Sequence, residues 1–149
     1  KTGYFPYTPS TNLLYGLHEA LDMILSEGLD NVFARHQRLA RACRVAVNAW
    51  GLDIQCADPS VYSPVLTGVM MPEGVDADAV RKIIYDRFDT SLGTGLGKVK
   101  GKMFRIGHLG ECNDVSLMGT LCAVEMGLAI AGVSLKGSGV AAAMAELQK

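Results

Sequence analysis

One arginine stands in the middle of an apolar, strand-like stretch, and it limits how the chain around it can fold. The stretch is Lys102–Gly110. Because side chains alternate along a strand, its two faces carry Met103, Arg105 and Gly107 on one side and Phe104, Ile106 and His108 on the other. A guanidinium in such a setting is costly to desolvate unless a carboxylate or a phosphate compensates its charge. The stretch therefore predicts an anion beside Arg105.

Two sources of that anion are open. Arg105 can form a structural ion pair with one of the chain's own acids, or its planar fork can hold a substrate carboxylate in a bidentate contact. The preceding segment, Ser91–Gly101, is rich in glycine, and glycine lets the backbone approach a ligand or a neighbouring segment closely. We therefore expect this segment to form the mouth of a site.

Composition narrows the class of protein. The chain has 149 residues and a formal net charge of −1, which fits one domain and argues against binding to nucleic acid or to an anionic membrane. It has no apolar run close to the roughly 20 residues of a membrane span and no secretory signal pattern. We therefore expect a cytoplasmic protein. Its first residue is not methionine, which suggests a processed product or a fragment.

The cysteines carry no metal-site or redox pattern. No two of them form a C-x-x-C pair and no histidine stands at metal-ligand spacing, so we expect no metal. We interpret all four as reduced thiols that lie mostly in the core, including one just before a predicted helix, and they are Cys43, Cys56, Cys112 and Cys122.

An extended arm and two helices are expected first. The prolines and aromatics of residues 1–9 disfavour helix, and Thr8 followed by Pro9 is typical of an N-cap with proline at the first helical position. The helix should end near Gly28 and turn one apolar side toward a core. A second helix, Leu29–Trp50, should end at Gly51. The apolar side of the first helix is Leu14, Leu17, Leu21, Ile24 and Leu25.

The remaining pattern alternates strands and helices. The expected strands are Asp53–Cys56, Ser63–Met71, Thr90–Leu92 and Met103–His108. The expected helices are one capped by Asp76 that runs to Arg87, a long one capped by Asn113, and an alanine-rich one over Val140–Leu147. Consecutive short strands favour antiparallel pairing. We therefore predict an α+β fold in which helices cover a mainly antiparallel sheet.

The other motifs carry little information about function. The glycines of Gly93–Lys98 do not form a phosphate loop, because a strand rather than a helix is expected after them. His18 and His36 are interpreted as packed or surface histidines, and His108 alternates away from Arg105.

Four arginines recur at every third position of the second helix, namely Arg35, Arg38, Arg41 and Arg44. At this net charge we interpret them as a solvated or subunit-facing surface rather than a nucleic-acid stripe.

Several segments together resemble one known family. They are Tyr4–Ser10, Glu27–Leu29, Ala49–Leu52 and Phe104–Gly110. In this order they resemble the C-terminal part of the serine–glyoxylate and alanine–glyoxylate aminotransferases, and the tail Gly137–Ala142 strengthens the match to the serine–glyoxylate branch.

The resemblance implies a class V, fold type I enzyme that uses pyridoxal phosphate (PLP) and works as a homodimer. The chain would be the small C-terminal domain, with an arm over residues 1–9 and the domain over residues 10–149, and the large PLP-binding domain would be absent. The activity would be transfer of an amino group from serine or alanine to glyoxylate or a similar 2-oxo acid. The alternative is a non-catalytic α+β module for carboxylate binding or dimerisation.

The resemblance also assigns roles to residues. Arg105 would hold the substrate carboxylate, in agreement with its strand pattern. Thr8 would contact the phosphate of the neighbouring subunit's PLP together with an aromatic hydroxyl. Because Phe5 stands three residues before Thr8, that hydroxyl would come from Tyr4 or Tyr7.

The lysine that binds PLP covalently would lie upstream of this chain. Lys1 is too close to the arm to be that lysine. The chain by itself is therefore expected to be inactive.

Overall fold

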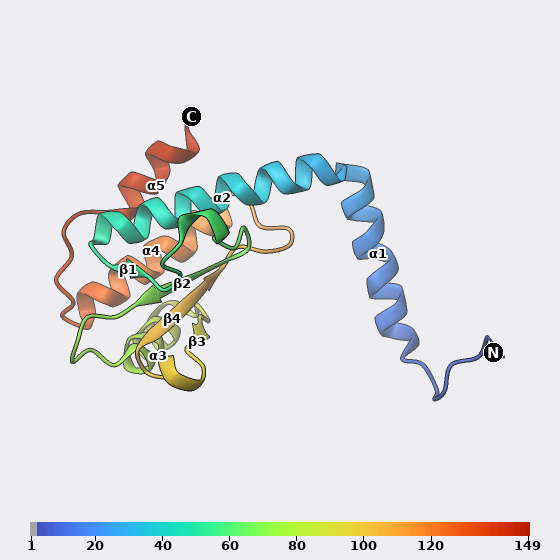
Figure 1. Ribbon diagram of the computed structural model, residues 1–149, viewed down its shortest axis with the longest axis horizontal. Coiled ribbons are helices and arrows are strands. Elements are labelled where there is room, and N and C mark those ends of the chain that lie inside the picture. The colour runs from blue at the N-terminus through green and yellow to red at the C-terminus, as the bar shows by residue number, and fades with distance from the viewer. Residues whose placement is uncertain (1–2) are drawn as a thin grey trace. The chain divides into compact units, whose positions relative to one another are not determined.

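The computed structural model describes residues 3–149 and divides the chain into two compact units (Figure 1). The first unit ends at Arg35 and the second is His36–Lys149. The expectation about Lys1 lies outside the described residues. The helices are α1 (Thr11–Glu27), α2 (Leu29–Trp50), α3 (Ala77–Phe88), α4 (Asp114–Ile130) and α5 (Gly139–Leu147), with short 3-10 turns η1 (Pro59–Val61) and η2 (Gly97–Val99). The strands are β1 (Asp53–Ile54), β2 (Leu66–Met70), β3 (Gly93–Thr94) and β4 (Met103–Gly107).

Helix α1 begins later than its sequence predicts. Its N-cap is Ser10 and not Thr8, and Pro9 precedes the helix instead of opening it. The first helical hydrogen bond runs from the Leu14 N–H to the Ser10 carbonyl, over 3.2 Å. Since the carbonyl of the N-cap accepts the first helical bond, the start of the helix is fixed two residues further along.

The apolar side of α1 is exposed. None of its residues is buried, so the expectation that this side faces a core is wrong within the unit. The leucines and isoleucine at helical spacing stay between 37% and 66% accessible. A continuous apolar stripe of this kind is typical of a surface that another element covers.

The arginines of α2 have partners within the chain, where a solvated or subunit-facing surface was expected. Arg35 pairs with Glu27 at 2.6 Å. Arg38 holds both carboxylate oxygens of Asp114, and Arg41 lies 3.6 Å from Glu146. Arg38 and Arg41 therefore fasten α4 and α5, which are distant in sequence, to α2.

The sheet has the order β1-β2-β4-β3, and all three pairings are antiparallel. The predicted α+β fold is thus confirmed. In Figure 1, β2 and β4 run side by side, and α4 lies between α5 and the strands. The strand β4 keeps the predicted alternation, since Phe104, Ile106 and His108 are all fully buried.

One strand prediction is wrong in position. Thr90–Leu92 is not a strand, and the pairing with β4 begins at Gly93. The reason is a side chain on α3: the Arg81 guanidinium binds the Leu92 carbonyl through Nε at 2.8 Å and through Nη2 at 2.6 Å. That carbonyl is therefore satisfied outside the sheet. The strands expected over Asp53–Cys56 and Ser63–Met71 are shorter than predicted.

The core lies between one face of the sheet and the helices. Trp50 from α2, Ile84 from α3 and Leu121 from α4 meet Phe104 and Ile106 there, all of them fully buried. Because fully burying one such side chain stabilises the fold by about 1.5–3 kcal/mol, this shared core holds the sheet and its helices together.

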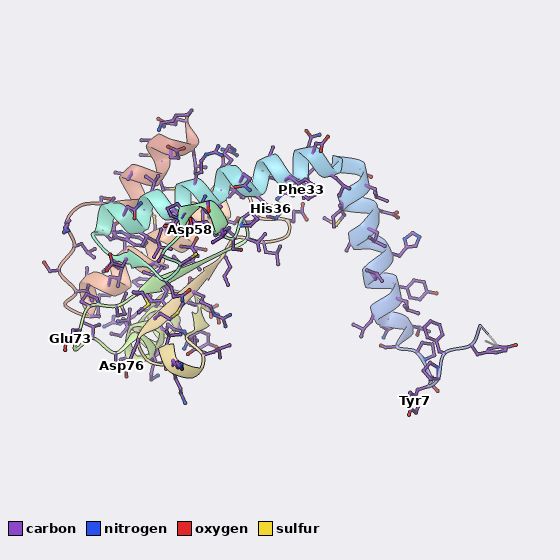
Figure 2. All side chains as sticks on the ribbon, in the orientation of Figure 1. Tyr7, Phe33, His36, Asp58, Glu73 and Asp76 are labelled. Carbon is purple, nitrogen blue, oxygen red and sulfur yellow. The ribbon has the colours of Figure 1, made fainter. Side chains whose placement is uncertain are left out.

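Caps fix the ends of the helices as the sequence predicts. The Asp76 carboxylate accepts from the Asp78 N–H at the start of α3, and Asn113 forms a reciprocal capping box with Ser116 at the start of α4. Figure 2 labels Asp58, which caps η1 in the same way. These short contacts satisfy backbone donors that have no partner inside the helix.

The cysteines are less buried than expected. No disulfide joins any of the four within residues 3–149, but Cys43 alone is buried and the other three are partly exposed. Among the described residues, no helix is both long and apolar enough to cross a membrane.

Candidate functional site

Arg105 lies at the centre of the sheet and has a glycine on either side. It pairs directly with Gly68 of β2 and with Gly93 of β3. Since side chains at directly opposite positions share one face of a sheet, both neighbouring positions on the Arg105 face are without a side chain. A Cβ placed on Gly93 would lie 3.0 Å from Nε and 3.1 Å from Cβ of Arg105. Gly93 therefore makes room for the Arg105 side chain, whereas a Cβ on Gly68 would meet Met103 and Gln55.

One hydrogen bond orients the guanidinium. Nε of Arg105 donates to the Thr94 carbonyl at 2.9 Å. Within residues 3–149, no carboxylate lies within ion-pair distance of Arg105, and its two Nη atoms make no hydrogen bond. Of the two anion sources that the sequence leaves open, the structural ion pair is thus absent from the described chain. The fork stays available to a ligand.

The carbonyl that orients Arg105 is itself anchored to α3. The Thr94 hydroxyl donates to the Asp78 carboxylate at 2.9 Å, and Arg81 donates to the same oxygen at 2.8 Å. The hydrogen bond from Thr94, and next the one from Arg81, lower the pKa of Asp78 below its usual value. A carboxylate that accepts these bonds stays ionised at neutral pH, so the network holds β3 in place under Arg105.

A pocket of about 210 Å³ opens beside Arg105. Its walls come from α2, from the segment between β1 and β2, and from β2 and β4. It is smaller than the roughly 300 Å³ at which drug-sized sites begin. Its lining residues are Arg44, Ile54, Gln55, Cys56, Val61, Tyr62, Ser63, Leu66, Thr67, Gly68, Met103 and Arg105. The volume suits a ligand of a few heavy atoms.

His108 belongs to the core and not to this pocket. Its Nδ1 lies 3.1 Å from the Pro64 carbonyl, and its Nε2 lies 2.9 Å from the Thr67 hydroxyl. Because a carbonyl can only accept, Nδ1 carries the proton and Nε2 accepts from Thr67. Burial lowers the pKa of His108 to about 4. The ring is therefore neutral, and its predicted separation from Arg105 is confirmed.

The other candidate residues lie on the segment before α1. Tyr4 and Tyr7 are 87% accessible, and Thr8 is also exposed. Figure 2 labels Tyr7, whose ring extends from this segment. Their role toward a phosphate stays a prediction.

Gly93 belongs to the segment Ser91–Gly101 that the sequence placed at the mouth of the site, but sequence reasoning missed Gly68, Arg44 and Tyr62. Gly68 lies beside Arg105 on β2, and a glycine inside a strand is a known signal of close approach. Arg44 was grouped with three other arginines, but it turns to the pocket and stacks on Tyr62, with its Cζ 5.1 Å from the ring centre. No signal in the sequence distinguishes it from its neighbours.

Comparison with known proteins gives a consistent result. No protein-family model matches the chain. It is 54% identical over 142 residues to the serine–glyoxylate aminotransferase of Hyphomicrobium methylovorum, which covers 95% of this chain and 35% of that protein. It is 50% identical over 149 residues to the enzyme of the same name from Methylorubrum extorquens, covering 99% of this chain and 37% of that protein. The chain is homologous to part of the serine–glyoxylate aminotransferases.

The fold agrees with this homology. The crystal structure of pyridoxamine–pyruvate aminotransferase from Mesorhizobium loti matches with a TM-score of 0.91 and 38% identity, over 99% of this chain and 38% of that one. The predicted resemblance to this aminotransferase family is thus confirmed. The chain spans about a third of the length of the serine–glyoxylate aminotransferases it matches.

Proposed function

We propose that this chain is the substrate-recognising, C-terminal part of a PLP-dependent transaminase. The enzyme moves an amino group from serine or alanine to glyoxylate or a similar 2-oxo acid. The observation that supports this best is Arg105, whose fork lines a small pocket and has no carboxylate partner among residues 3–149. An amino donor and a 2-oxo acceptor share one feature, the carboxylate next to the reacting carbon, so one arginine serves both halves of the reaction.

The role of this chain is orientation. Two Nη atoms of Arg105 hold the two oxygens of the substrate carboxylate in parallel hydrogen bonds. The Thr94 carbonyl holds Nε at 2.9 Å, and the Asp78 carboxylate holds Thr94. The fork therefore keeps its direction when the substrate leaves. Holding a reactant in one geometry lowers the barrier because less freedom is lost in the transition state.

The segment before α1 fits the phosphate group of PLP. Hydroxyls and backbone N–H groups are suitable phosphate donors, and a helix N-terminus favours an anion. Tyr4, Tyr7 and Thr8 are exposed there, and Ser10 makes no side-chain cap bond. Thr8 with Tyr4 or Tyr7 would hold that phosphate. PLP, when bound, supplies the electron sink for amino-group transfer.

The assembly is a homodimer in the cytoplasm. The exposed aromatic segment and the exposed apolar side of α1 support a partner subunit. In this arrangement Thr8 reaches the cofactor of the neighbouring subunit. The lysine that binds PLP covalently comes from a part of the enzyme outside this sequence.

A second candidate is a non-catalytic module that binds a carboxylate or mediates dimerisation. The exposed apolar side of α1 favours it as well, because this surface serves association in either case. The two candidates differ in whether amino transfer follows carboxylate binding.

One experiment separates the two candidates. Residues 1–149 replace the corresponding part of the Hyphomicrobium methylovorum enzyme, and serine–glyoxylate turnover is measured for this chimera and for the free chain with PLP. We expect turnover in the chimera, and neither turnover nor a borohydride-trapped PLP–lysine adduct in the free chain. A chimera that folds and binds PLP without turnover would favour the non-catalytic module.

A further inference from the structure

A second arginine lines the pocket that holds Arg105. Arg44 of α2 stacks on the ring of Tyr62, and its Nη1 makes one long contact, 3.4 Å, with the Ser63 carbonyl. Its side chain is half-buried. Within residues 3–149 it has no carboxylate at ion-pair distance, unlike Arg35, Arg38 and Arg41 of the same helix.

The charge of Arg44 is poorly compensated by the groups around it. Burial lowers the pKa of Arg44, which means that the charged form has lost part of its hydration. The Tyr62 ring stacks on one face of the guanidinium, and this contact offsets some of the lost hydration. The planar edge carries the N–H groups that bind carboxylates, and within the described residues 3–149 its only hydrogen-bond partner is the distant Ser63 carbonyl. An anion that reaches this edge would gain a charge-assisted contact.

Part of the pocket wall is apolar and suits a short carbon chain. Ile54, Leu66 and Met103 contribute apolar surface to the pocket, and its volume is about 210 Å³. Arg44 lines the pocket from α2 and Arg105 lines it from β4, so the two charges enter it from different elements. Two cations from different elements in one small, partly apolar pocket match a small molecule with a carboxylate at each end.

We propose that the pocket binds short dicarboxylates, with one carboxylate on Arg105 and the second on Arg44. This rests on the proposed function, in which Arg105 holds the carboxylate next to the reacting carbon. In the proposed function the acceptor is glyoxylate or a similar 2-oxo acid. The present proposal specifies that this similar acid carries a second carboxylate. Arg44 is then a specificity-determining residue, and the contact with Tyr62 holds it in place.

The test compares two ligands that differ in one carboxylate. Succinate and butyrate have four carbons each, and both are titrated at neutral pH into the full chain while amide NMR shifts of Gly68, Gly93 and Ser63 are followed. We expect succinate to bind about tenfold more tightly than butyrate, as a further charge-assisted contact provides. Butyrate should shift the two glycines, and succinate should shift Ser63 as well.

The variants assign the effect to one residue. Arg44→Gln should bring the two affinities together, mainly by weakening succinate. Arg41→Gln, which removes the same charge one turn away outside the pocket, should keep the tenfold difference. Arg105→Gln should weaken both ligands.

Three outcomes would count against the proposal. Equal affinities in the wild-type chain overturn the dicarboxylate site but leave carboxylate binding by Arg105 standing. If the difference between the succinate and butyrate affinities survives Arg44→Gln, or disappears in Arg41→Gln, the preference comes from net charge and not from Arg44. If neither ligand binds, both the inference and the role of Arg105 in the proposed function are wrong.

Discussion

Nε of Arg105 donates to the backbone carbonyl of Thr94 at 2.9 Å, and Thr94 is tied through its hydroxyl to Asp78 on α3. The direction of the guanidinium is thus set by the backbone of the edge strand β3 and not by an acid. An acid in that position would neutralise the charge, whereas a carbonyl orients it and leaves both Nη atoms to a ligand.

Gly93→Ala should disturb the site without unfolding the domain. The new Cβ would lie 3.0 Å from Nε and 3.3 Å from Cζ of Arg105, so the guanidinium must shift. Because small misplacements of a positioning group are costly in rate, we expect kcat/KM of the chimera to fall about tenfold, with little change in melting temperature. Gly107→Ala on β4 is the matched control, since a Cβ there meets nothing within 4 Å. Equal activity in both variants would mean that the space beside Arg105 is not needed.

His108 should make stability depend on acidity. Its folded pKa, about 4, lies below the ordinary value of 6.5, so the unfolded chain binds the proton more readily than the folded one. The contribution of the neutral His108 ring to the free energy of unfolding is fully present above pH 6.5 and is lost as the pH falls toward 4. The difference corresponds to about 3 kcal/mol.

Unfolding free energies measured in denaturant between pH 7 and pH 4 check this expectation. His108→Gln should flatten the part of the curve above about pH 4.5, where carboxylates contribute least. An NMR titration that places the His108 pKa near its ordinary value would contradict the buried, neutral ring.

Glu125→Ala should destabilise the packing of α5. Oε2 of Glu125 accepts from the indole Nε1 of Trp50 at 2.7 Å and from the Val140 N–H at 2.9 Å, while Oε1 accepts from Ser138. Burial acts to raise the pKa of this acid, but these hydrogen bonds outweigh it and lower the pKa overall. Removing the acid leaves the buried indole N–H without its acceptor, which costs about 1–3 kcal/mol.

Trp50 fluorescence during denaturant unfolding provides the measurement. Ser138→Ala is the control, because it removes the N-cap of α5 but keeps the bond to Trp50, and it should cost about 1 kcal/mol. If the two variants unfold at the same denaturant concentration, the indole bond contributes nothing measurable.

Leu17→Gln with Leu21→Gln should weaken self-association and leave the unit His36–Lys149 intact. Both side chains are about half accessible on α1, where no residue is buried, so their loss costs the monomer little. Sedimentation of the full chain should show fewer dimers, and Glu19→Gln on the same helix should change nothing. A loss of unfolding free energy above about 1 kcal/mol in the leucine variant would mean that these residues pack inside the monomer.

The sequence predicts the elements of this fold well because local rules decide them. Asp76 and Asn113 cap their helices as expected, and alternation assigns Arg105 and His108 to opposite faces. Two of the errors occur where distant groups intervene. Arg81 takes the Leu92 carbonyl and delays β3, which no local pattern records. Arg44 differs from the other arginines of α2 in stacking on Tyr62, eighteen positions away in sequence.

The role of Arg105 is tested most directly by replacing it in the chimera. Single-turnover kinetics with serine, alanine and glyoxylate are recorded for Arg105→Ala and Arg105→Lys, together with the PLP absorption spectrum and thermal stability. We expect Arg105→Ala to lower kcat/KM in both half-reactions by on the order of 2 to 5 kcal/mol while PLP stays bound. Arg105→Lys should recover only part of the loss, because it keeps the charge without the planar fork. If Arg105→Ala instead lowers stability by several kcal/mol and the folded enzyme keeps its kcat/KM, Arg105 supports the fold and does not bind the substrate.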